Sequence, residues 1–159
     1  MDDEKELQAA KKVYATLCQA LEKHEWHFKR NDEKLVIDCG AQGEDLPISI
    51  NIVVDPERCV ALLLSKMPFN IQEDKRIDLA LAVSAVNNAL VDGSFDYDVA
   101  SGTMFFRMTN SFIDSEISEE LFTYMLFCSC QTIDEYNDKF LMVSKGMISV
   151  EQFISFFNK

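Results

Sequence analysis

The sequence predicts an α+β protein in which a single antiparallel sheet is flanked by helices. Two observations lead to this fold class. Segments whose apolar residues recur at helical spacing stand at the beginning, in the middle and at the end of the chain. Between them, segments with a period of two come in neighbouring pairs joined by short turns. Strands grouped between helices, without regular β-α alternation, are typical of one antiparallel sheet.

Length and composition are those of one domain, and we expect a single α+β domain over residues 1–159. A chain of this length can bury about 68–70% of its extended surface, and 12 Phe supply bulky core material. No run of 18 or more apolar residues occurs, so no membrane contact is expected. The N-terminal MDDEKELQ is acidic where a secretory signal is basic and then apolar, which predicts a cytoplasmic protein.

The predicted element order is α-ββ-ββ-α-ββ-α-α. Residues 3–23 have the spacing of an amphipathic helix. The period then changes to two, and residues 26–28 and 35–37 are predicted to form a short hairpin around residues 31–33. In the second hairpin, residues 48–54 alternate between apolar and polar side chains, as in a strand with one buried face.

The partner strand of this second hairpin is apolar on both faces. With a four-residue turn over residues 55–58, Val54 pairs with Cys59, and Val60, Leu62 and Leu64 fall beside Val53 on the face opposite the core. Burial of three aliphatic side chains contributes about 1.5–3 kcal/mol each, so a cover is expected.

Two covers for this row are considered. One is the predicted second helix, residues 74–91, which is apolar nearly all round. The other is a homodimer in which the same strand and helix meet their own copies. Together with Phe105, the residues Val53, Val60, Leu62 and Leu64 form the predicted surface for self-association or for a protein partner.

The second half of the chain supplies a third hairpin and two helices. Residues 94–99 and 104–109 are predicted to pair around a turn at residues 100–103, which sets Val99 opposite Met104, Tyr97 opposite Phe106 and Phe95 opposite Met108. Ser118 is placed to cap a long helix over residues 118–143. Ser149-Val-Glu-Gln152 fits a capping box, which opens a terminal helix, about residues 149–158, as an appendage.

The element order, together with the segment AVNNALVDGSFDYDVASGTMFFRM, resembles the YbjN-like family, which looks like the fold of type III secretion chaperones. The matching features are Asn87 and Asn88 on a helix, a stop at Gly93, an aromatic at Phe95 and a hairpin that turns at Gly102. An apolar strand and a long helix that opens near Ser118 follow them. The resemblance covers roughly residues 5–143.

The resemblance implies an α+β protein that is sometimes labelled a sensory transduction regulator. It also implies relatives among small, acidic, dimeric chaperones that bind partly unfolded polypeptide. The hairpin near Trp26 and the terminal Phe-rich helix go beyond the compact chaperone pattern. The resemblance is a pattern of elements, so it transfers no functional residue to this chain.

The net charge of −12 excludes one class of partner. Between Ile77 and Asp138 there are eleven acidic residues and one basic residue, Arg107. A field of this sign repels phosphate backbones, so no nucleic acid is expected as a partner. The acidity is explained either by solubility alone or by affinity for basic or unfolded polypeptide.

No catalytic or metal-binding arrangement is found in the sequence, and no cofactor is expected. The only histidines are His24, at a predicted helix end, and His27, which is predicted to face solvent between Trp26 and Phe28. No nucleotide-binding glycine motif occurs. The five cysteines are interpreted as reduced core thiols. Asp92, Asp96 and Asp98 lack the Gly and Glu positions of a calcium loop.

The leading hypothesis is therefore a non-catalytic protein-interaction module, chaperone-like or regulatory, that binds another polypeptide and self-associates as a homodimer. The alternative is a small-molecule-binding protein with an apolar pocket between sheet and helices. An enzyme that relies on carboxylates alone ranks third.

Overall fold

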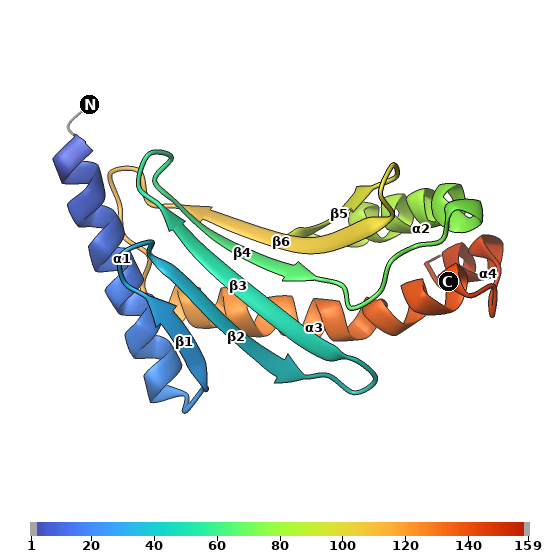
Figure 1. Cartoon of the computed structure of the whole chain (residues 1–159), viewed down its shortest axis with the longest axis horizontal. Coiled ribbons are helices and arrows are strands. Elements are labelled where there is room, and N and C mark those ends of the chain that lie inside the picture. The colour runs from blue at the N-terminus through green and yellow to red at the C-terminus, as the bar shows by residue number, and fades with distance from the viewer. Residues whose placement is uncertain (1–2, 158–159) are drawn as a thin grey trace.

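Six strands form one antiparallel sheet in the computed structural model, which describes residues 3–157 (Figure 1). The strand order is β1-β2-β3-β4-β6-β5. The strands are β1 Phe28–Asn31, β2 Val36–Gln42, β3 Pro47–Asp55, β4 Val60–Lys66, β5 Ser94–Asp98 and β6 Thr103–Ser111. Residues 1, 2, 158 and 159 of the predicted domain, and with them the predicted end of the terminal helix, lie outside the described residues.

In the described residues, four helices accompany the sheet: α1 Asp3–Lys23, α2 Arg76–Ala89, α3 Glu119–Ser144 and α4 Val150–Ser155, with a 3₁₀ turn, η1 Glu73–Lys75, before α2. In Figure 1, α3 passes behind β2 and β3, α1 lies at one end of the sheet, and α2 and α4 lie at the other. The order of elements and the antiparallel α+β fold class predicted from the sequence are confirmed.

The central strands bury one face only. Ile48, Ile50, Ile52 and Val54 of β3 are buried, whereas the residues between them are half-buried or exposed. The same alternation is found in β4 and in β6. Because successive side chains of a strand point to opposite faces, the sheet has a side that packs on the helices and a side without helices, which we call the open face.

The registers of the second and third hairpins differ from the predicted ones by two residues. Val54 pairs with Ala61 and not with Cys59, and Phe95 pairs with Phe106 and not with Met108. In each case a residue with a left-handed backbone is the last residue of the turn, Cys59 with φ 51° and Gly102 with φ 73°. The turns therefore span residues 56–59 and 99–102, in place of the predicted 55–58 and 100–103. An even shift leaves every side chain on its predicted face.

Aromatic side chains join the sheet to the last two helices. The ring of Phe140 on α3 lies 5.0 Å from that of Phe95 on β5 and 5.5 Å from that of Phe153 on α4, between ring centroids. Phe153 is fully buried, Val150 is buried, and the predicted capping box of Ser149 is present. The terminal helix therefore docks on the domain, since its central ring lies in the same core as the sheet.

A side chain of α2 closes part of the outer edge of β5. The amide nitrogen of Asn87 donates to the carbonyl oxygen of Phe95 at 3.0 Å, and the backbone N–H of Phe95 donates to the Asn87 side-chain oxygen at 2.8 Å. Asn87 thus pairs with Phe95 much as a neighbouring strand would. Gly93, which leads into β5, has φ 73°, and a Cβ atom there would lie 2.4 Å from the ring of Phe106.

We expect Phe153→Ala to lower the free energy of unfolding by about 3–5 kcal/mol, because the ring is fully buried. Urea denaturation followed by circular dichroism measures the loss. Phe156→Ala is the matched control, because that ring is 51% exposed and its removal should cost less than about 1 kcal/mol. Equal losses in the two variants would show that α4 does not dock through Phe153.

We expect Asn87→Ala to cost about 1–3 kcal/mol, because it leaves the N–H and C=O of Phe95 without their partner. Native-state hydrogen exchange should also become faster at the Phe95 amide. Asn88→Ala makes the same change at the next, exposed position of α2 and should have little effect. If both variants lose the same stability, the pairing with Phe95 does not hold the edge.

Candidate functional site

The five residues predicted as an interaction surface all lie on the open face of the sheet. Val53 and Leu62 are direct partners across β3 and β4, and Val60 and Leu64 lie two residues to either side of Leu62. Phe105 is on the same face of β6, opposite Lys66. All five are half-buried. Their use as a binding surface remains a prediction.

One further residue belongs to this surface. Val36 is the partner of Val53 across β2 and β3, and it lies between two buried neighbours, Leu35 and Ile37. The sequence predicts these residues in a hairpin but does not indicate which face of the sheet each of them occupies. Side chains alternate between the two faces of a strand, so Val36 must face away from Leu35 and Ile37. All three are apolar, however, and the sequence alone does not indicate which of them faces the core. We call Val36, Val53, Val60, Leu62 and Leu64 the open-face patch.

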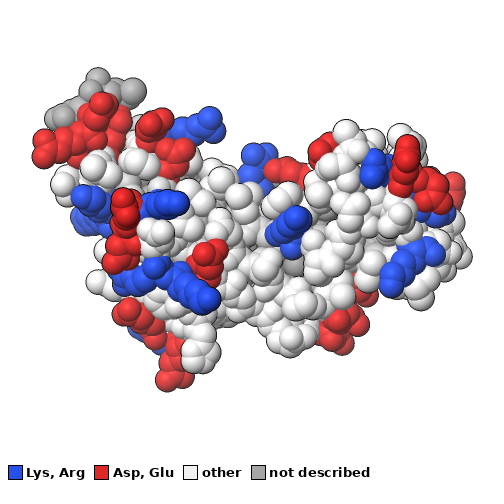
Figure 2. Space-filling view, in the orientation of Figure 1, with Lys and Arg blue, Asp and Glu red and all other residues white. Residues whose placement is uncertain are grey.

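Charges of both signs border the open-face patch. On one side, Lys29 of β1 is paired in register with Asp38 of β2. On the other side, Arg107 of β6 lies opposite Leu64 and forms an ion pair with Asp96, with 2.9 Å between Nε and Oδ2. Figure 2 shows this face of the molecule, in which uncharged residues occupy most of the middle. The patch is therefore a mostly apolar surface with a mixed-charge border.

The second helix does not cover the open-face patch. It packs against β5, α3 and α4, with Leu79, Ala82, Val83 and Val86 buried. Its outer side leaves Ile77 67% exposed and Leu81 51% exposed. Of the two covers considered from the sequence, α2 is thus excluded by its position.

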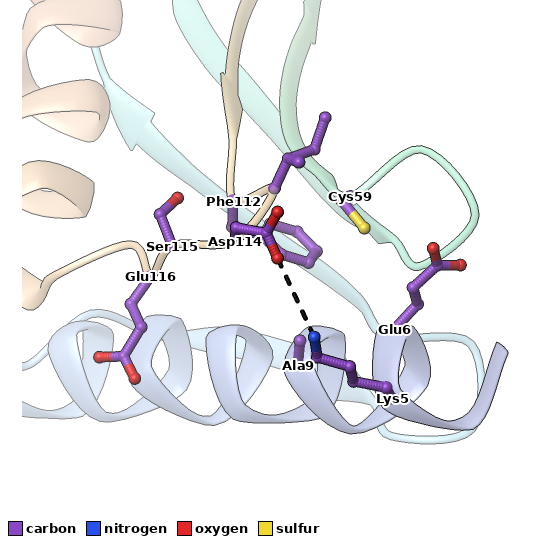
Figure 3. Close-up of a pocket in the computed structure, with 9 residues that line it drawn as sticks. Lys5, Glu6, Ala9, Cys59, Phe112, Asp114, Ser115 and Glu116 are labelled. Carbon is purple, nitrogen blue, oxygen red and sulfur yellow. Dashed lines mark ion pairs between the residues drawn. The ribbon is translucent and has the colours of Figure 1, made fainter. Parts of the chain in front are cut away.

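Two hollows lie at opposite ends of the sheet. The first, of about 620 Å³, lies between the N-terminal half of α1, the β3–β4 turn and the segment after β6 (Figure 3). Ala9, Cys59 and Phe112 supply its apolar lining, and Lys5 and Asp114 lie 4.0 Å apart at its rim. The second, of about 670 Å³, is lined by residues of β2, β3 and β4 and of the chain that follows β4. The layer between β3 and the helices is instead filled by buried side chains.

The acidic residues after α2 are each engaged in a different local structure. Asp92 accepts a hydrogen bond from the hydroxyl of Tyr124, and Asp96 pairs with Arg107. Asp98 accepts from the Ser101 hydroxyl at 2.7 Å and from the Ala100 amide, and these bonds hold the pKa of its carboxyl below the usual value. These carboxylates therefore do not converge on a common point.

Chemically reactive groups are dispersed over the described part of the chain. His24 and His27 are both exposed. Within residues 3–157, no group of three or more His, Cys, Asp or Glu side chains is arranged to hold a metal ion. All five cysteines are free thiols. Burial raises the pKa of Cys39 to about 12 and that of Cys130 to about 11, which favours the unreactive thiol form.

No helix in the region that the structure describes has both the length and the apolar character needed to cross a membrane. The two longest helices are amphipathic elements of the core: α1 buries seven residues and α3 nine.

The fold is an open antiparallel sheet that packs on helices through one face and exposes apolar side chains on the other. It defines a class of small α+β proteins. The chain belongs to the YbjN family, because a sequence profile of that family matches residues 14–142. The family is described as "Putative bacterial sensory transduction regulator".

A solved structure has a similar fold. A crystal structure of YbjN, described as "a putative transcription regulator from E. coli", superposes on the chain with a TM-score of 0.57. The sequence identity is 15%, and the match covers 77% of this chain and 87% of that one. At this identity the likeness shows the fold alone. No curated protein sequence matches the chain.

We expect Cys39 and Cys130 to react slowly with a thiol reagent such as DTNB at pH 8 in the folded protein. With a pKa of about 12, only roughly one Cys39 thiol in ten thousand is ionised at that pH. Mass spectrometry after brief labelling identifies the modified residues, and labelling in guanidinium provides the fully reactive control. Rapid modification of Cys39 before unfolding would contradict the expectation.

Proposed function

We propose that the protein is a cytoplasmic, non-catalytic interaction module of a regulatory system, which binds another polypeptide and forms a homodimer through the open face of its sheet. The observation that carries the proposal is the open-face patch. Val36, Val53 and Leu62 adjoin one another across three neighbouring strands, and Val60 and Leu64 extend the patch along β4. Contiguous apolar surface of this kind is typical of a protein–protein interface.

The energy of burial favours a cover for this surface. Each of these aliphatic side chains contributes about 1.5–3 kcal/mol when it passes from full exposure to full burial. All of them are half-buried within one chain, so part of this free energy is left for association. Association also has costs in rotational and translational freedom, so the patch supports a dimer only together with its border.

The charged residues around the open-face patch are compatible with the binding of a second copy of the chain. The chain carries a net charge of −12, which opposes self-association through most of its surface. Around the open-face patch, however, Lys29 and Arg107 stand beside Asp38 and Asp96. A two-fold arrangement can therefore bring unlike charges together at the rim, while the patch meets its own copy at the centre.

A small-molecule binder remains the second candidate, and one observation favours it. The hollow of about 620 Å³ beside α1 is within the size range of ligand pockets, with Phe112 and Ala9 in its lining. Its rim residues Lys5 and Asp114 have side chains 76% and 88% exposed, so a ligand there would remain partly in contact with water. Self-association distinguishes the two candidates, because a pocket protein has no need of it.

We expect the wild-type protein to be a dimer at high micromolar concentration and Leu62→Glu to be a folded monomer, since a carboxylate at the centre of the patch would be buried without a partner. Size-exclusion chromatography with light scattering gives the mass, and circular dichroism checks the fold. Ser84→Glu adds the same charge on the exposed side of α2 and should leave the dimer intact.

Two results would contradict the proposal. A wild-type protein that is monomeric at high micromolar concentration would exclude the dimer. A monomer produced by Ser84→Glu, with Leu62→Glu still dimeric, would move the interface from the sheet to α2.

A further inference from the structure

A second surface, on the side of α3 that faces away from the sheet, exposes aromatic rings. Tyr124 is 52% exposed and Phe127 is 48% exposed. They are three residues apart on one helix and therefore lie next to each other. Trp26, which follows α1, packs its ring against that of Phe127. We call Trp26, Tyr124 and Phe127 the aromatic strip.

The rings of the aromatic strip are held in place. Phe127 makes edge contacts with Trp26, at 6.2 Å between ring centroids, and with His24, at 5.7 Å. The hydroxyl of Tyr124 donates to the carboxylate of Asp92, and this bond raises the pKa of Tyr124 to about 12. A surface with fixed rings loses little conformational entropy when a partner binds.

Acidic residues lie on the same exposed side of α3 as the aromatic strip. The exposed side of α3 runs through Glu120, Tyr124, Phe127, Gln131 and Glu135, so an acidic residue stands at each end. The first basic residue of α3 is Lys139. The only basic residue between Ile77 and Asp138 is Arg107, which is on the open face and paired with Asp96. Lys23, which comes near this surface, is paired with Glu119 at 3.0 Å.

Fixed, half-exposed aromatic rings on a helix that also carries carboxylates favour one kind of ligand. A guanidinium or ammonium group stacks on an aromatic face, and arginine does so more often than lysine. The neighbouring carboxylates add charge attraction and steer the approach of a cation. A second copy of this chain is a poor occupant, because it would bring the same acidic residues against Glu120 and Asp92.

We propose that the aromatic strip binds an arginine-bearing segment of the polypeptide partner. This inference rests on the polypeptide-binding role proposed above and names the chemistry of the segment. It also places that segment on the opposite side of the molecule from the open-face patch, so a dimer formed through the sheet can bind one basic segment on each subunit.

The test uses a fluorescein-labelled hexa-arginine peptide, with binding to the full chain followed by fluorescence anisotropy. Trp26 is the only Trp of the chain, so its emission gives a second readout at the strip. We expect saturable binding that weakens as salt is raised, and no binding of a hexa-glutamate peptide. Tyr124→Ala combined with Phe127→Ala should weaken binding at least about fivefold, since each ring supplies a cation–π contact.

Matched variants separate this site from general attraction to an acidic protein. Glu120→Gln should weaken binding about threefold, in the range of one exposed charge contact, whereas Glu57→Gln, the same change at the exposed β3–β4 turn, should not. Phe127→Tyr keeps an aromatic face and should retain the affinity, which guards against a loss caused by misfolding of the alanine variant.

The outcomes distinguish this inference from the function on which it rests. Binding that persists unchanged without the two rings, or no binding of hexa-arginine at all, overturns the inference. Binding that is lost in Leu62→Glu but kept without the rings also overturns it, while leaving a polypeptide-binding open face. Loss of binding with the rings and retention in Leu62→Glu support the aromatic strip as the site.

Discussion

The packing of every helix on one side of the sheet is the constraint on which the rest of the structure depends. A strand presents two rows of side chains, and in β3, β4 and β6 only the row toward the helices enters the core. Within residues 3–157, no helix packs on the other row. In β4 most residues of that row are aliphatic, so the centre of the open face is apolar. The open face is for this reason a candidate interface.

Local signals made most of the fold predictable from the sequence. The bounds of α1, the cap at Ser118 and the capping box at Ser149 depend on neighbouring residues, and the structure has all three. Two registers were wrong by two residues, because the left-handed residue that ends each turn, Cys59 in one and Gly102 in the other, fixes the turn one position away from where the pattern placed it. Because each shift was an even number of residues, every side chain of these strands was predicted on the correct face of the sheet.

The features of the candidate site that the sequence did not reveal depend on contacts between distant elements. The position of α2 beside β5 follows from the Asn87–Phe95 pairing and from packing against α3 and α4, and hydrophobicity alone could not distinguish this from a place over the open face. The aromatic strip needs Trp26 and Phe127, about a hundred residues apart, to meet. No periodicity within either segment encodes such a contact.

The pairing of Asn87 with β5 also bears on how copies of this protein can assemble. An uncovered edge strand invites another strand to add to it, and repeated addition produces open-ended fibres. Here the backbone of Phe95 already has its partner, and at the opposite edge β1 is four residues long and carries Lys29 and Arg30. Both edges thus resist growth of the sheet by strand addition. The two-fold contact proposed for the open face would close on itself, so we expect no open-ended assembly even when the protein is concentrated.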